Sequence, residues 1–178
     1  MVKLKKVKLL LLVCIMVFSL AACGSDGNDG QKDENRQSGD MKVAMVTDSG
    51  DITDQSFNQT TYETCKAWAE ENDVEFKYYK PESDSDEARN ASIDLAIADG
   101  ANVVVLPGFL FAAALIEQPE MYPDVKFVAL DIGAGDICGK GVGEGYSHNP
   151  DDYNVADYYH TDNVYCCTYK EELSGYMA

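Results

Sequence analysis

Short apolar runs alternate with longer amphipathic segments along the chain from Met41 onward. Short continuous apolar runs are typical of strands covered on both faces, whereas the longer segments repeat apolar residues at helical spacing. The alternation predicts βαβ units that form a parallel sheet. Five strands are expected, at Val43–Thr47, Val74–Tyr79, Val103–Leu106, Lys126–Leu130 and Val164–Tyr169. The third, which is apolar throughout, is expected at the centre of the sheet.

The first helix is expected to begin at Ser56, because Ser56 and Gln59 have the spacing of a capping box. It should end near Asn72. Its predicted inward face consists of residues at helical spacing, namely Phe57, Thr61, Cys65 and Trp68.

The second helix is expected to be capped by Ser83 or Ser85 and to stop at Gly100, a favoured residue after a helix end. Its predicted inward stripe is Ala88, Ala91, Leu95 and Ala98. A third helix is expected over Phe109–Gln118, after the turn at Pro107 and Gly108.

No regular element is expected between Ile132 and Asp162, a segment rich in glycine and acidic residues. Long loops of this kind are uncommon unless they are functional or disordered. A last helix should start at Glu171–Leu173, and a single turn with nothing after it is marginal. We therefore expect Ala178 to be the edge of a fragment.

The amino-terminal residues 1–22 have the order of a secretory signal: four lysines, an apolar core from Leu9 to Leu20, and then small residues. The sequence Leu-Ala-Ala-Cys ending at Cys23 resembles the lipobox of bacterial lipoproteins, which implies a lipid on the Cys23 sulfur; an ordinary signal peptide is the alternative. Residues 23–40 are polar and are expected to form a solvated tether. The globular part is then residues 41–178.

The formal charge of −17 becomes −21 once the four lysines of residues 1–22 are removed. Such an acidic chain repels phosphate backbones, so nucleic acid is an unfavoured partner. Four cysteines remain after the signal and Cys23. They show no C-x-x-C spacing, so no metal site is expected, and Cys65, Cys166 and Cys167 are expected to be buried in apolar stretches.

Enzymatic motifs are absent from the sequence. The glycines at Gly133 and Gly135 follow a strand, but Cys138 occupies the last glycine position of the dinucleotide motif and no helix is expected there. No G-x-S-x-G elbow and no P-loop lysine are present. We expect neither catalysis nor a cofactor.

Polar and aromatic residues follow three of the expected strands. Asp48, Gly108 with Phe109, and Asp131 stand at the carboxyl ends of the first, third and fourth strands. Open parallel sheets place their ligand sites at that edge. Carboxylates there can accept hydrogen bonds from hydroxyls or amines, although Asp48 and Asp131 could equally stabilise turns.

KVAMVTDSGDITDQSFNQ, starting at Lys42, resembles the opening of the basic-membrane-protein family, the substrate-binding lipoproteins of ABC importers related to purine nucleoside receptors. The likeness continues in DLAIADGANVVVLPGFLF, YPDVKFVALD and NVYCCTYKEELSGYMA. It implies a type I periplasmic-binding-protein fold, with two α/β lobes closing on a nucleoside and a membrane-anchored place outside the cytoplasm. Permease and ATPase components would be its partners.

The resemblance also implies roles for individual residues. Asp48 would hold ligand hydroxyls or the base edge, Phe57 would stack on the base, and Asn58 would bond to it. Asp131, with Gly108 and Phe109, would line the cleft. Packing inside the first helix is the alternative for Phe57.

Family members of this kind have a second lobe, which we expect this chain to lack. One wall should bind nucleosides poorly, because the missing contacts are lost and the others stay wet. Micromolar affinity for inosine or guanosine would contradict this expectation. Two other functions remain open: a regulatory or structural surface lipoprotein, and a receptor for sugars or autoinducers on the same fold.

Overall fold

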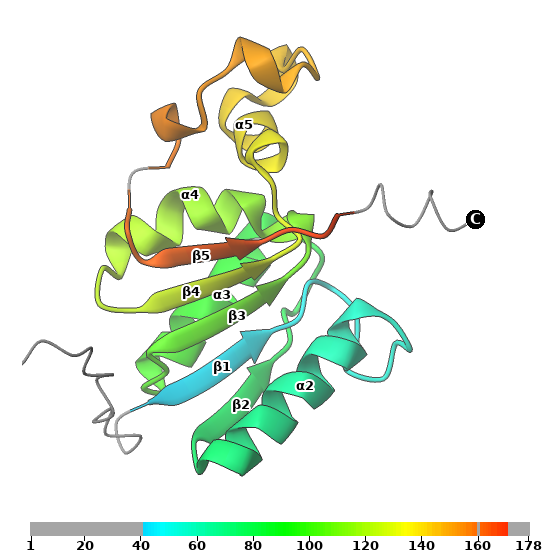
Figure 1. The fold of residues 1–178 in the computed structure, drawn as a ribbon, viewed down its shortest axis with the longest axis vertical. Coiled ribbons are helices and arrows are strands. Elements are labelled where there is room, and N and C mark those ends of the chain that lie inside the picture. The colour runs from blue at the N-terminus through cyan, green and yellow to red at the C-terminus, as the bar shows by residue number, and fades with distance from the viewer. Residues whose placement is uncertain (1–40, 160, 171–178) are drawn as a thin grey trace, which may run out of the picture. The chain divides into compact units, whose positions relative to one another are not determined.

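A five-stranded parallel sheet organises the protein, whose computed structural model describes residues 41–159 and 161–170. The strand order is β2-β1-β3-β4-β5, and every neighbouring pair is parallel. Figure 1 shows the two edge strands, β2 and β5, on opposite sides of the sheet. The strands are β1 Lys42–Val46, β2 Glu75–Tyr79, β3 Val103–Pro107, β4 Lys126–Leu130 and β5 Val164–Cys167.

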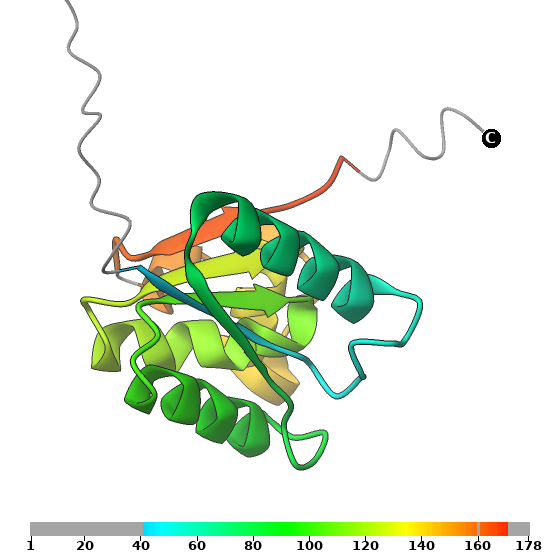
Figure 2. The same ribbon diagram turned by 90° about the horizontal axis from the view of Figure 1, so that it is seen from below.

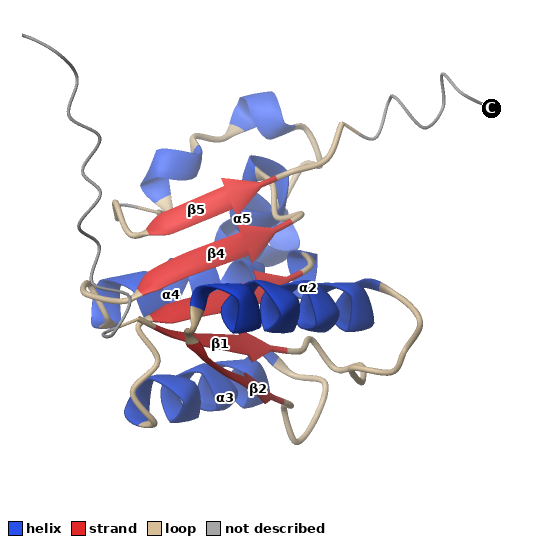
Figure 3. Cartoon of the chain, turned by 60° about the horizontal axis from the view of Figure 1, so that its bottom comes forward, coloured by secondary structure: helices blue, strands red, loops and turns tan. Residues whose placement is uncertain are grey.

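Helices connect the strands and cover both faces of the sheet. They are α2 Phe57–Asn72, α3 Asp86–Ala98, α4 Ala112–Met121 and α5 Ala134–Val142, with short 3₁₀ turns at Phe109–Phe111, Gly143–Gly145, Pro150–Asp152 and Val155–Asp157. The sheet lies between α2 on one side and α3, α4 and α5 on the other (Figures 2 and 3). The chain passes from β1 to β2 on one side of the sheet and then back past β1 to β3 on the other side. Because both crossovers are right-handed and run in opposite directions, their helices α2 and α3 lie on opposite faces of the sheet. None of the described helices is long and apolar enough to cross a membrane.

The core is divided by the sheet into two unequal parts. Alternate residues of a strand face opposite sides, so Ala44 and Val46 contact the larger cluster under α3, α4 and α5. Val43 and Met45 contact the smaller cluster under α2. β3 is almost fully buried, which confirms the predicted central strand.

The predicted inward face of α3 is displaced around the helix axis, whereas that of α2 is wrong only at Trp68, since Thr61 is buried and Phe57 and Cys65 are half-buried. In α2 the buried residues are Asn58, Thr61 and Ala69, and Trp68 is 44% exposed, so the placement of Trp68 inside was wrong. In α3 the buried residues are Arg89, Ser92, Ile93 and Ala96. Leu95 is 55% exposed, and Ala91 and Ala98 are exposed too. The predicted stripe missed this face because it left out Ile93 and did not allow for a buried arginine.

The predicted ends of α2 and α3 were correct, but the predicted capping box of α2 was wrong. The Ser85 side chain accepts a hydrogen bond from the Ala88 N–H, and Gly100 lies just beyond the helix with a φ of +99°. Ser56 occupies the N-cap position of α2 but makes no side-chain capping bond. Asp54 takes over that role, since its Oδ1 accepts from the N–H groups of Ser56 at 2.8 Å and Gln59 at 3.2 Å.

The segment 132–162 contains α5 and three 3₁₀ turns, so the prediction that it has no regular element was wrong. β5 ends at Cys167, two residues before the predicted end. Cys166 and Cys167 are exposed, so the prediction that they are buried was wrong. The signal segment, Cys23, the tether and the helix expected from Glu171 lie outside the described residues.

Candidate functional site

The candidate site lies along the carboxyl edge of the sheet, where the strand order reverses. Asp48 follows β1, Gly108 and Phe109 follow β3, and Asp131 follows β4. β1 and β3 are neighbours, although helices on opposite faces leave them. The structure therefore brings together, at the switch point of the sheet, the strand ends that the sequence predicted.

Asp48 is held by a network of donors from its own turn. Its Oδ1 accepts hydrogen bonds from the Gly50 N–H at 2.7 Å, the Ser49 N–H at 2.5 Å and the Asn58 Nδ2 at 2.8 Å. The Asn58 Oδ1 in turn accepts from the Asp48 N–H at 3.3 Å. Among the described residues no donor reaches Oδ2 of Asp48, so one oxygen is fixed and the other is available.

The network keeps Asp48 ionised. Partial burial opposes ionisation, but hydrogen bonds from Gly50, Asn58 and Ser49 outweigh burial and lower the pKa of Asp48 below its ordinary value. The neighbouring Asp54 acts against them through charge repulsion. The result is a half-buried carboxylate with a fixed orientation.

Asn58 connects two carboxylates and is only 4% exposed. Its Nδ2 donates to Asp54 Oδ2 at 3.0 Å as well as to Asp48, so both amide hydrogens are engaged within the protein. Gly50 is packed against this amide: a Cβ at that position would lie 2.6 Å from Asn58 Nδ2. Asp54 and Gly50 were not among the predicted site residues, although both stand in the same polar turn as Asp48.

Two aromatic residues, Phe57 and Phe109, lie at the turn that follows β3. A Cβ on Gly108 would be 3.9 Å from Phe57 Cδ1, so α2 and the β3 turn meet closely here. Gly108 has a φ of +101°, which side chains rarely adopt. The half-buried Phe57 ring meets Tyr169 edge-on, with ring centroids 6.1 Å apart, and Phe109 is 61% exposed. Tyr169 was not among the predicted site residues.

Asp131 ends β4 in a strained backbone conformation. Its φ is +58°, and its N–H donates to the Cys167 carbonyl at 2.7 Å. Non-glycine residues in this conformation are uncommon and often mark turns or sites. Asp131 is half-buried and directly follows β4, which is the neighbour of β3 in the sheet.

The glycines after β4 do begin a helix, contrary to the prediction. The amino end of α5 is nevertheless occupied by its own residue, because Asp136 Oδ2 accepts from the Gly133 N–H at 2.8 Å. The Asp136 carboxylate at the amino end of α5 would repel a pyrophosphate. The charge at this helix end therefore disfavours a dinucleotide site, although a helix does follow the glycines. Within the described part of the chain, no group of three or more metal-ligating side chains is found.

Comparison with known proteins gives a family match over residues 41–178. Residues 41–178 match the family model Bmp, described as ABC transporter substrate-binding protein PnrA-like. A lipoprotein of Pyrococcus horikoshii is 31% identical over 132 residues, covering 74% of this chain and 32% of its own length. The ABC transporter nucleoside-binding protein BmpA of Lactococcus lactis is 29% identical over 116 residues, covering 63% of this chain and 32% of its own length.

The fold is also found in a solved structure. A lipoprotein fragment of Peptoclostridium difficile superposes with a TM-score of 0.51 at 18% identity, covering 77% of this chain and 92% of the other. The match with the sequence relatives spans about a third of their length, 32% in both cases above.

Proposed function

We propose that this chain, which belongs to the Bmp family of PnrA-like ABC transporter substrate-binding proteins, forms one wall of a purine nucleoside site in an importer. The observation that carries the proposal is the clamped carboxylate of Asp48. Three donors hold Oδ1, and no described donor holds Oδ2. A fixed, ionised acceptor of this kind suits a ligand that offers hydroxyl or amine hydrogens.

The aromatic side chains beside Asp48 support a ligand with a flat ring. Phe57 lies at the start of α2 against the β3 turn, and the exposed Phe109 follows the same turn. Stacking of a base on an aromatic contributes about 1–3 kcal/mol in nucleic-acid complexes. A sugar alone would satisfy the carboxylates and leave the exposed Phe109 ring without a flat ligand surface to stack on.

Asn58 has a different part in this proposal from the one that the family resemblance implied. Since both of its amide hydrogens are used by Asp48 and Asp54, Asn58 positions the carboxylate and does not donate to the ligand. Asp131 is the second ligand carboxylate in the proposal. Gly108 gives the base access because any side chain there would approach Phe57.

The charge of the site favours a neutral ligand over a phosphorylated one. Asp48, Asp51, Asp54 and Asp131 all lie at this edge, and Lys80 pairs with Asp51 at 2.9 Å. A phosphate dianion placed among several carboxylates is repelled. We therefore propose nucleosides, and not nucleotides, as ligands.

The same proposal includes a lipid anchor at Cys23 and delivery of the ligand to permease and ATPase components. It is supported by the lipobox-like sequence before Cys23 and by the Pyrococcus relative, which is a lipoprotein. The nucleoside preference is supported by the BmpA relative. Mass spectrometry of the chain purified from bacterial membranes tests the anchor: cleavage before Cys23 with added acyl mass is expected, and an unmodified Cys23 contradicts it.

Nuclear magnetic resonance titration of the full chain tests the ligand class. Inosine at millimolar concentration is expected to shift the backbone amides of Gly50 and Gly108. Ribose should shift Gly50 alone, and inosine monophosphate should shift both less than inosine does.

A matched pair of variants tests the site itself. Asp48→Asn should abolish the inosine shift at Gly108, because the ligand loses its ionised acceptor, whereas Asp124→Asn, an exposed residue before β4, should leave it unchanged. Equal responses to ribose and inosine would favour a sugar receptor. An absence of shifts at both glycines would contradict the proposed site.

A further inference from the structure

The outer edge of β2 is the feature from which we draw a further inference. β2 pairs with β1 and with no other described strand, so one side of its backbone has no strand partner. Three of its five residues, Glu75, Lys77 and Tyr78, are exposed. Edge strands of this kind are templates for pairing with another chain unless something prevents it.

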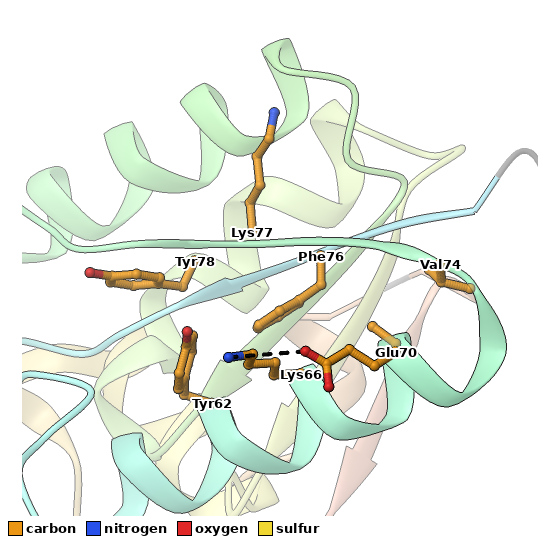
Figure 4. A pocket seen from close by; sticks show the side chains of 8 residues that line it. Tyr62, Lys66, Glu70, Val74, Phe76, Lys77 and Tyr78 are labelled. Atoms are coloured by element: carbon orange, nitrogen blue, oxygen red, sulfur yellow. Dashed lines mark ion pairs between the residues drawn. The ribbon is translucent and has the colours of Figure 1, made fainter.

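A cavity of about 230 Å³ opens between this edge and α2, as Figure 4 shows. Its aromatic part is a cluster of three rings: Tyr62 of α2 meets Phe76 with centroids 5.7 Å apart and Tyr78 with centroids 5.3 Å apart. Tyr78 remains 43% exposed. Val74 extends the apolar surface beyond Phe76.

Charged residues of β2 lie on the opposite face of the strand. Figure 4 shows Phe76 pointing toward α2 and Lys77 pointing away from it. Glu75 is placed between two lysines, 3.4 Å from Lys77 and 3.5 Å from Lys42. These contacts are exposed, so they are weak and can be exchanged for others.

We propose that β2 pairs antiparallel with β2 of a second copy of this chain, joining two five-stranded sheets. Backbone geometry restricts the register. The Thr47 N–H donates to the Tyr79 carbonyl, so Tyr79 points its backbone groups toward β1. Because direction alternates along a strand, Phe76 and Tyr78 point theirs to the open edge, and only these residues can exchange hydrogen bonds with a second copy.

Charge then favours one register over the two neighbouring registers that the backbone allows. Phe76 opposite Phe76 of the second copy places Glu75 opposite Lys77 twice, in the closely spaced pairs that make no backbone bonds. A shift of the strands in one direction places Glu75 opposite Glu75, and a shift in the other places Lys77 opposite Lys77. Like charges directly opposite each other are destabilising.

The apolar face agrees with the same register. Val74 lies opposite Tyr78 of the second copy, so the two aromatic clusters become one continuous surface that buries the exposed Tyr78 ring. Both faces of the strand are thus self-complementary, as an interface with two-fold symmetry requires. The carboxyl edge that carries Asp48 stays open, because β2 pairs through its side.

Reversing the charges of Glu75 and Lys77 tests the register. Dimerisation of the full chain is measured by sedimentation velocity in a mild detergent. Glu75→Lys alone and Lys77→Glu alone each convert two opposite-charge pairs into two like-charge pairs. Each should weaken dimerisation by roughly tenfold or more. Their mixture should form a heterodimer, because one variant carries only positive and the other only negative charge at positions 75 and 77.

Glu71→Lys and Lys126→Glu are matched controls, since both residues are exposed and lie outside β2. Both should dimerise as the unaltered chain does, and circular dichroism identifies any variant that fails to fold. The double variant Glu75→Lys with Lys77→Glu should restore the dimer. A monomeric unaltered chain, or single variants that dimerise like the controls, would overturn the proposal; in the first case Lys77 would serve to keep the edge unpaired.

Discussion

Replacing Asn58 with alanine should remove the support of the Asp48 turn. The substitution deletes three hydrogen bonds: Nδ2 to Asp48 at 2.8 Å, Nδ2 to Asp54 at 3.0 Å, and the bond that Oδ1 accepts from the Asp48 N–H at 3.3 Å. It also leaves the two carboxylates without the amide that lies between them. Asn58 is 4% exposed, so water cannot replace it without rearrangement of the turn.

The magnitude follows from the nature of the partners. A hydrogen bond to a charged group contributes about 1.5–3 kcal/mol, and Asn58 makes one to the half-buried Asp48. The bond to the exposed Asp54 contributes less, because water competes for that carboxylate. We expect the free energy of unfolding to fall by about 2–4 kcal/mol in total.

Urea denaturation followed by circular dichroism measures this loss. Asn72→Ala is the matched control, since Asn72 is an exposed residue of the same helix whose Nδ2 makes one bond, to the Trp68 carbonyl at 2.7 Å. It should cost roughly 0.5 kcal/mol or less, as surface substitutions do. If Asn58→Ala costs no more than Asn72→Ala, the hydrogen bonds do not organise the turn as described.

Three further outcomes are expected. The lowered pKa of Asp48 means that its contribution to stability is present above the ordinary pKa of 3.8 and is lost as the pH falls through the folded value, so urea midpoints should drop in acid, and less steeply in Asn58→Ala. Arg89→Met should cost about 1–3 kcal/mol, because Arg89, 5% exposed, donates to Asp84 at 2.7 Å and Asp86 at 2.8 Å. Cys65 should resist alkylation at pH 8, since burial raises its pKa to about 11, whereas the exposed Cys167 should react.

Each of these outcomes has a comparison that can contradict it. For the acid dependence, the comparison is the fall in urea midpoint with falling pH. If it is equally steep in the unaltered chain and in Asn58→Ala, then the Asn58 bond does not lower the pKa of Asp48. For Arg89, the comparison is Lys140→Met, because Lys140 also pairs with Asp86 but is 41% exposed and should cost far less. For the cysteines, mass spectrometry of a time course identifies the modified residue, and early alkylation of Cys65 would mean that α2 opens readily.

The strands and their order along the chain were predictable because continuous apolar runs admit few alternatives. β4 was predicted with its observed bounds, and β3 was correctly placed at the centre. A strand buried on both faces has to be apolar at every position. It can therefore be recognised in the sequence without knowing which face each side chain points to. The carboxyl ends of these strands, with Asp48 and Asp131, followed from the same pattern.

Helix faces and the site's internal bonds were harder to predict because they depend on tertiary contacts. A shift of one residue separates the predicted stripe of α3 from the observed one, and Arg89 occupies a buried position only because Asp84 and Asp86 neutralise it. α5 was missed since its glycines have low helix propensity, which packing overrides here. A capping pattern at Ser56 was present in sequence, but Asp54 competes for the same N–H groups.

The turn after β1 holds three carboxylates close together, and hydrogen-bond donors around them stabilise their negative charges. Asp48, Asp51 and Asp54 lie within seven residues, and three carboxylates so close should raise one another's pKa. The fold supplies donors to all three: Lys80 bonds to Asp51 and lowers its pKa. At Asp48 and Asp54 desolvation acts the other way, but hydrogen bonds from backbone N–H groups and from the shared Asn58 amide outweigh it and lower both pKa values. The turn therefore keeps its negative charge near neutral pH without unfolding. Under the proposed function, a ligand that approaches Asp48 would meet fixed acceptors, which is the physical reason for the proposed preference for hydroxyl and amine groups over phosphates.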